Sequence, residues 1–128
     1  MPIRQELDPE SRVFRTTASG TITLEDLRRH IAVVRQVRAT DYPELIDARE
    51  TTSVVLRSRD LLQVAHLAKE ALGHARPQPR AVVVASGEHF AIARTISALV
   101  AGWMNLGVFH DTESAERWLA HHLRREAT

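Results

Sequence analysis

Hydrophobic and polar positions repeat with two different periods along the chain, so the pattern predicts strands and helices in turn. Residues 2–8 and 12–18 show the alternation of half-buried strands on either side of the turn Asp8-Pro9-Glu10-Ser11. Together they predict a β-hairpin. Gly20 is expected to break the second extended run.

Four segments carry apolar residues at helical spacing. The first covers residues 24–38 after a capping hydroxyl at Thr23. The second has Ser58 as its predicted N-cap and stops at Gly73. A third helix follows Ser86-Gly87, and Asp111 is expected to cap a terminal helix. The four predicted buried stripes are Leu27, Ile31, Val34 and Val37; Leu61, Ala65, Ala68 and Leu72; Ile92, Ile96, Leu99 and Trp103; and Ala115, Trp118, Leu119 and Leu123.

Three segments between these helices predict further strands. Residues 44–48 are apolar at their centre, and residues 80–85 form a β-branched run without alternation. Both patterns are typical of strands buried on two faces, and we expect 80–85 to be the central parallel strand. Residues 105–109 supply the last strand, whereas residues 49–57 are expected to form a polar loop.

This order of elements predicts one α/β domain over residues 1–128. Its sheet is expected to be mixed and mostly parallel, with about five strands, one antiparallel edge strand and about four flanking helices. Ligands of such sheets bind outside the carboxyl ends of the strands. That edge would collect the loop 47–58, the Ser86-Gly87-Glu88 turn and His110-Asp111.

Composition narrows the function classes. The 44% hydrophobic and 26% charged residues are those of a globular chain, and no cysteine is present for disulfides or thiolate chemistry. The net charge of +1 is dispersed, so nucleic acid is not the expected partner. Neither a signal-peptide pattern nor an apolar run long enough to span a membrane occurs, and a cytoplasmic location is expected.

Several local patterns occur together and in a particular order. Leu45-Ile46-Asp47-Ala48-Arg49 ends a strand, and Arg80-Ala81-Val82-Val83-Val84 precedes Phe90 and Arg94. The remaining patterns are Gly20-Thr21-Ile22-Thr23, Val108-Phe109-His110-Asp111 and Ala115-Glu116-Arg117-Trp118-Leu119. With this spacing, most of the chain resembles the bacterial SpoIIAA-like family, a STAS-type group that is similar in fold to Sec14-type domains.

The resemblance implies a small mixed sheet flanked by helices, no enzymatic activity, and a role in regulation or in carrying apolar small molecules. Anti-sigma-factor antagonists of the STAS group carry a phosphorylated Ser or Thr in an Asp-Ser-Ser-Gly-like turn. This chain has Asp47-Ala48-Arg49-Glu50-Thr51-Thr52-Ser53 instead, which is longer and lacks the glycine. Thr51, Thr52 and Ser53 remain possible phosphoacceptors, or ordinary solvated hydroxyls.

The candidate ligand contacts gather at the predicted carboxyl edge. They are Asp47, Arg49, Ser86, Phe90, Arg94, Phe109 and His110. Five of them have a structural alternative: Asp47 and Arg49 as an ion pair, Ser86 as a helix cap, and Phe90 as a core residue with Arg94 lying over the sheet.

The leading hypothesis is therefore a non-enzymatic domain that binds a small, partly apolar or lipid-like molecule. The first alternative is a regulatory interaction domain controlled by Ser or Thr phosphorylation, and the second is an enzyme that uses His110. No cofactor is predicted. No metal site is predicted either, because none of the seven histidines forms a His-Glu-x-x-His motif. A homodimer is a further possibility.

Overall fold

Five strands form one mixed sheet in which neighbours along the chain are also neighbours in space. The computed structural model describes residues 2–73 and 77–127. The strands are β1 (Ile3–Asp8), β2 (Val13–Thr23), β3 (Glu44–Val55), β4 (Pro79–Val83) and β5 (Asn105–Phe109). They lie in the order β1-β2-β3-β4-β5, and only β1 runs antiparallel to its neighbour. The predicted fold class and the antiparallel edge strand are confirmed.

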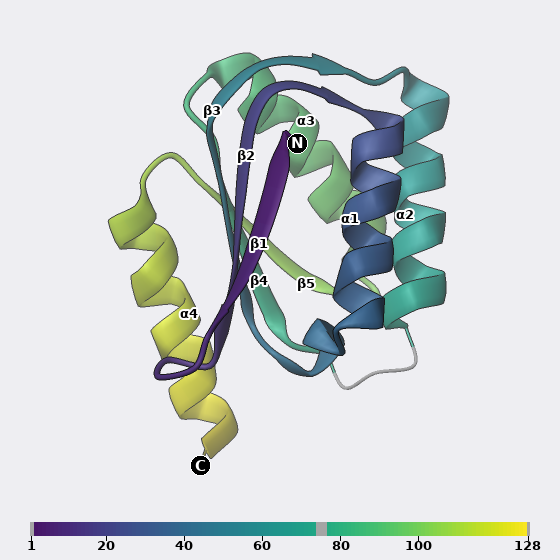
Figure 1. Cartoon of the computed structure of the whole chain (residues 1–128). Helices are drawn as coiled ribbons and strands as arrows, with labels where there is room; N and C mark the ends of the chain where they lie inside the picture. Colours follow the sequence, from purple (N-terminus) through teal and green to yellow (C-terminus); the bar gives the residue numbers. More distant parts are fainter. Residues whose placement is uncertain (1, 74–76, 128) are drawn as a thin grey trace.

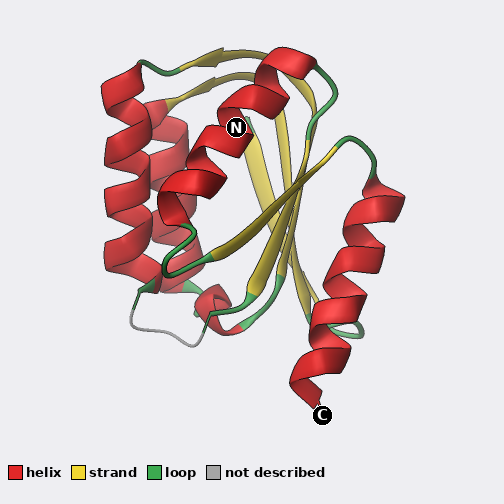
Figure 2. Ribbon diagram, turned by 180° about the vertical axis from the view of Figure 1, so that it is seen from behind, coloured by secondary structure: helices red, strands yellow, loops and turns green. Residues whose placement is uncertain are grey.

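Helices cover the two faces of this sheet unequally. On one face lie α1 (Leu24–Gln36), α2 (Ser58–Leu72) and α3 (Gly87–Val100), and α4 (Thr112–Ala127) lies alone on the other (Figures 1 and 2). A short 3-10 helix, Ala39–Asp41, joins α1 to β3. Two separate apolar layers result, one on each side of the strands.

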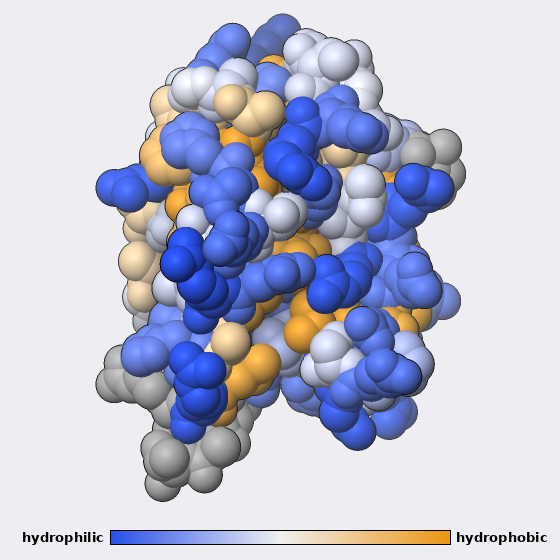
Figure 3. All heavy atoms as spheres, turned by 90° about the vertical axis from the view of Figure 1, so that its left-hand side faces the viewer, coloured by the Kyte–Doolittle hydropathy of each residue, from blue (hydrophilic) through white to orange (hydrophobic). Residues whose placement is uncertain are grey.

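The α4 face is closed by tightly packed side chains. Its buried core consists of Val13, Leu45, Ala81, Val83, Ala115 and Leu119, with Phe109 and Trp118 packed against it. Gly107 of β5 fits here because a Cβ atom at this position would lie 2.8 Å from Phe109 and 3.1 Å from Trp118. Hydrophilic side chains predominate on the outside of this face (Figure 3).

Strands β2 and β3 are longer than the sequence pattern indicates. The predicted break at Gly20 is wrong, because β2 continues through this residue with φ +69° and with register shifts on either side. A glycine accommodates this backbone without a Cβ penalty and lets the strand bend. The far halves of β2 and β3 therefore arch towards the beginnings of α1 and α2 (Figure 1).

The predicted polar loop over residues 49–57 is also wrong, because β3 extends to Val55. Arg49, Glu50, Thr52 and Ser53 face solvent, whereas Thr51 and Val54 are partly buried. Apolar content alone therefore underestimated the strand. Parallel pairing with β2, from Gly20↔Thr51 to Thr23↔Val55, supplies the missing backbone partners.

Two local details also differ from expectation. The middle strand of the sheet is β3, whereas β4, predicted to be central, lies between β3 and β5. Helix α2 has Arg57 at its N-cap position, and the Asp60 carboxylate accepts a hydrogen bond from the Arg57 amide at 2.8 Å. Ser58 is thus the first helical residue. The predicted cap at Thr23 is confirmed, since its hydroxyl accepts from the Asp26 amide.

Candidate functional site

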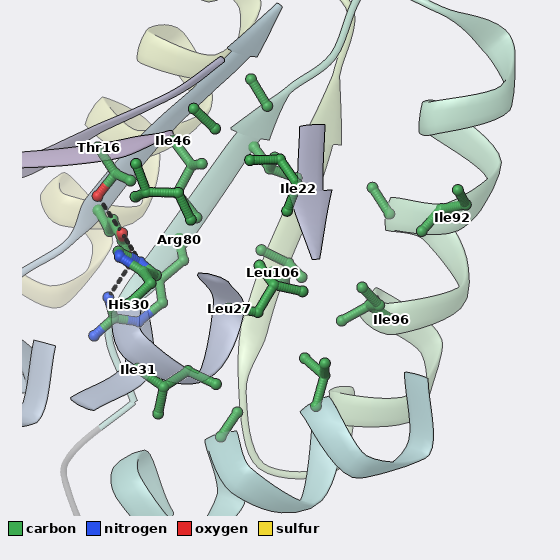
Figure 4. Close-up of a pocket in the computed structure, with 18 of the residues that line it drawn as sticks. Thr16, Ile22, Leu27, His30, Ile31, Ile46, Arg80, Ile92, Ile96 and Leu106 are labelled. Atoms are coloured by element: carbon green, nitrogen blue, oxygen red, sulfur yellow. Dashed lines mark hydrogen bonds and ion pairs between the residues drawn. The ribbon is translucent and has the colours of Figure 1, made fainter. Parts of the chain in front are cut away.

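A cavity of about 200 Å³ lies between the sheet and helices α1, α2 and α3 (Figure 4). Aliphatic side chains make up most of its wall. The strands contribute Ala18 and Ile22 from β2, Ile46, Ala48 and Val54 from β3, and Val82 from β4. Because side chains alternate along a strand, Leu45 beside Ile46, and Ala81 and Val83 beside Val82, face the α4 core instead.

The helices line the other side of the cavity with residues one turn apart. From α1 come Leu27, Ile31 and Val34; from α2, Val64, Ala68 and Leu72; and from α3, Ile92, Ala93, Ile96 and Val100. Parts of the predicted helical stripes thus enclose a hollow space rather than only a filled core. Trp103, predicted for the α3 stripe, lies beyond the end of that helix.

A cluster of polar side chains forms one side of this apolar cavity. We call Thr16, His30, Glu44 and Arg80 the polar cluster. Glu44 is the first residue of β3, Arg80 is the second of β4, and the two are partners in the parallel register. Thr16 projects from the neighbouring strand and His30 from α1 (Figure 4).

Hydrogen bonds join the members of the polar cluster to one another. The Glu44 carboxylate accepts from Arg80 Nη1 at 2.5 Å and from the Thr16 hydroxyl at 2.7 Å, and it lies 2.8 Å from His30 Nε2. The other ring nitrogen of His30, Nδ1, lies 3.0 Å from the side-chain amide nitrogen of Gln5. A second Arg80 nitrogen donates to the carbonyl of Ala39. The cluster thus provides its own hydrogen-bond partners.

These neighbours keep Glu44 ionised despite its burial. Its side chain is only 2% exposed, and burial raises its pKa. The electrostatic attraction and hydrogen bond of His30, the charge of Arg80 and the Thr16 hydroxyl outweigh burial and lower the pKa to about 2. A buried carboxylate is therefore held beside a buried guanidinium, which is only 3% exposed.

Two other polar residues, Thr51 and His89, line the same cavity. Thr51 comes from the arched half of β3, and His89 from the first turn of α3. The Thr51 hydroxyl oxygen has less than 1 Å² exposed and no hydrogen-bond partner among the described residues. It is seven positions beyond Glu44, roughly 20 Å away along an extended strand.

The residues predicted as ligand contacts lie outside this cavity, at the carboxyl ends of the strands. Two pairs of them do meet. Arg49 donates to Asp47 at 2.8 and 2.9 Å, and the Phe90 and His110 rings stack with centroids 4.2 Å apart. The remaining three are separate: Ser86 caps α3, Phe109 packs on Trp118, and Arg94 is exposed.

The candidate phosphoacceptors differ in exposure, because a register shift between Thr51 and Ser53 interrupts the alternation of β3. Thr52 and Ser53 are exposed, and their proposed modification stays a prediction. Thr51 instead lines the cavity, and its hydroxyl oxygen is buried.

Sequence reasoning missed the polar cluster, although one signal pointed to it. Glu44 and Arg80 are opposite charges at the start of two strands that were predicted to be buried and parallel. A charge in such a place needs a partner, and adjacent parallel strands would supply one. Thr16 and His30 carry no comparable signal, because their positions depend on the packing of β2 and α1.

Two further searches of residues 2–73 and 77–127 bear on function. No helix in these ranges is long and apolar enough to cross a membrane. The same ranges contain no group of three or more His, Cys, Asp or Glu side chains placed to hold a metal ion.

Neither a protein-family model nor a curated protein matches the chain. Among solved structures, the chain is similar to a protein of the DUF3478 family from Shewanella loihica PV-4, which is described as uncharacterised and as having a SpoIIAA-like fold. The TM-score is 0.59 at 19% sequence identity, and the similarity covers 91% of each chain. At this identity the comparison shows the fold, so the chain has the SpoIIAA-like α/β fold predicted from its sequence.

Proposed function

We propose that this protein is a non-enzymatic binding protein that holds a small, largely apolar molecule between its sheet and helices α1 to α3. The observation that carries the proposal is the cavity of about 200 Å³ with an almost entirely aliphatic wall. Closely packed interiors rarely contain a void of this size. An engineered apolar cavity of about 150 Å³ binds benzene, so a molecule of about eight to ten carbon atoms suits this one.

The arrangement of the polar cluster supports binding rather than catalysis. The Thr16 hydroxyl donates to Glu44 and not to His30, so it has no adjacent imidazole base. Both ring nitrogens of His30 already face Gln5 and Glu44. The base that Thr16 does meet is the Glu44 carboxylate, whose pKa of about 2 makes it a weak acceptor for the proton of a nucleophilic hydroxyl.

Native mass spectrometry is the first test. The protein is purified without refolding, and any small molecule released on denaturation is identified. A stoichiometric apolar molecule supports the proposal.

The second test is calorimetric titration with naphthalene, in which the wild type is compared with a matched pair of variants. Ala93 lines the cavity, whereas Ala91 is exposed on the same helix. Ala93→Leu should fill the space and weaken naphthalene binding at least tenfold, and Ala91→Leu should leave it unchanged. The proposal would be refuted if the native mass of the wild type equals that of the polypeptide alone and naphthalene does not bind up to the limit of its solubility.

A further inference from the structure

Strand β1 forms one edge of the sheet. It pairs with β2 on one side, and no other strand among the described residues lies beside it. In Figure 1 it lies at the front of the sheet, and none of the described helices crosses over it. The opposite edge, β5, differs because the Ser97 hydroxyl of α3 already donates to its Leu106 carbonyl at 2.7 Å. An open row of backbone N–H and C=O groups, as on β1, is a template for pairing with another strand.

Two hydrogen bonds of β2 show which backbone groups of β1 point outward. The Ser19 amide donates to the Pro2 carbonyl, so Pro2 directs this group towards β2. The Phe14 amide donates to Pro43, away from β1, and therefore does not bond to Leu7, which lies opposite. Hydrogen-bonded pairs alternate along an antiparallel ladder. The residues of β1 whose N–H and C=O groups point outward are therefore Ile3, Gln5 and Leu7.

The side chains of β1 complement those of a second, reversed copy of the same strand. Counted in both directions from Gln5, the sequence places Arg4 opposite Glu6 and Ile3 opposite Leu7. Two copies paired antiparallel about Gln5 would thus join Arg4 of each copy to Glu6 of the other. These would be non-hydrogen-bonded pairs, in which side chains approach most closely. The same pairing would bring Ile3 over Leu7, which is 41% exposed in the single chain.

Charge complementarity favours this register over its neighbours. A shift of one copy by two residues keeps the outward groups paired but sets Arg4 opposite Arg4 or Glu6 opposite Glu6, and like charges in these positions are destabilising. Both side chains are exposed, and neither forms an ion pair within the described part of the chain. Arg15, opposite Glu6 on β2, contacts other carboxylates, at 3.8 and 3.7 Å.

From this geometry we infer that two copies of the chain pair through β1, antiparallel about Gln5, and form one continuous sheet from the five strands of each copy. The outward N–H and C=O groups of each copy would then bond to those of the other. Edge-to-edge pairing keeps equivalent faces on the same side, so both cavities would lie on one face of the joint sheet. The inference does not depend on whether the cavity binds a ligand.

Sedimentation velocity of the full chain over a series of concentrations measures the equilibrium between monomer and dimer. Arg4→Glu would place two carboxylates at each cross-strand contact, and Glu6→Arg would place two guanidinium groups there. Each variant should raise the dissociation constant of the dimer at least about tenfold, because two repulsive pairs replace two attractive ones. The control Arg59→Glu makes the same change of charge at an exposed position of α2 and should leave dimerisation unchanged.

A mixture of the two weakened variants separates a lost contact from a damaged fold. When an Arg4→Glu chain pairs with a Glu6→Arg chain, both contacts again join opposite charges, so the mixture should dimerise about as strongly as wild type.

Three results would overturn the inference. The wild type could remain monomeric at the highest concentration reached, or the mixture could fail to recover the dimer. Alternatively, both single variants could dimerise as strongly as wild type, which would mean that the copies meet through another surface.

Discussion

At the scale of single residues, Glu44 is an ionised carboxylate that the fold holds away from water. Its carboxylate is buried and has three partners on three different elements: Thr16 on β2, His30 on α1 and Arg80 on β4. Such a group is stable only as an ion in the folded chain, because its partners are organised for a negative charge. Unfolding releases it into water, where it titrates normally.

This difference predicts how acid destabilises the protein. The folded pKa of Glu44 is about 2, below its ordinary value of 4.5, so Glu44 contributes stability that is fully present above about pH 4.5. As the pH falls from 4.5 towards 2, about 3 kcal/mol of unfolding free energy should be lost at this site. Urea unfolding at a series of pH values measures this loss of unfolding free energy.

Glu44→Gln is the informative variant for this prediction. It should have a lower free energy of unfolding than wild type at pH 7. The difference between the two proteins should become steadily smaller below pH 4.5. Glu50→Gln, at an exposed position of the same strand, should follow the wild-type curve. Parallel pH curves for wild type and Glu44→Gln would contradict the assignment.

At the scale of elements, β5 shows how closely the α4 face is packed. Adding one methyl group at Gly107 places it within 3.1 Å of both Phe109 and Trp118. We expect Gly107→Ala to lower the free energy of unfolding by about 1–3 kcal/mol, as overpacking does. Gly102→Ala is the control, because a Cβ atom there would have no neighbour within 4 Å. Urea unfolding of the two variants should give clearly different midpoints.

The sequence predicted the elements well where periodicity was strong and poorly where it was not. The four helices and the strands around residues 44–48, 80–85 and 105–109 follow from apolar spacing. The arched half of β3 does not, because its exposed positions are polar and its pairing with β2 joins residues about thirty positions apart. Long-range pairing of this kind depends on the whole sheet.

The candidate site was less predictable for the same reason. Apolar spacing identifies the residues that leave water but does not say whether the space between them is filled. Ile46 on β3 and Ile92 on α3 were both expected to be buried, yet they face a shared hollow. The rule that ligands bind at the carboxyl ends of parallel strands pointed to Asp47 and His110. The cavity lies elsewhere, between the sheet and helices α1 to α3.

At the scale of the whole molecule, ligand binding should be coupled to global stability. A ligand held only by the folded chain raises the free energy of unfolding, and at ten times its dissociation constant the gain is about 1.4 kcal/mol. Naphthalene should therefore shift the urea midpoint of the wild type and of Ala91→Leu upwards, but not that of Ala93→Leu. An equal shift in all three proteins would mean that the probe binds elsewhere.

The two faces of the sheet have separate apolar layers, and this separation has an evolutionary consequence. Odd-numbered positions of β4, such as Ala81 and Val83, belong to the filled layer, whereas Val82 faces the hollow one. Substitutions on the hollow side can change the size and shape of the space while the packed side continues to hold the fold together. Related chains could thus diverge in what they accommodate without having to find a new way to fold.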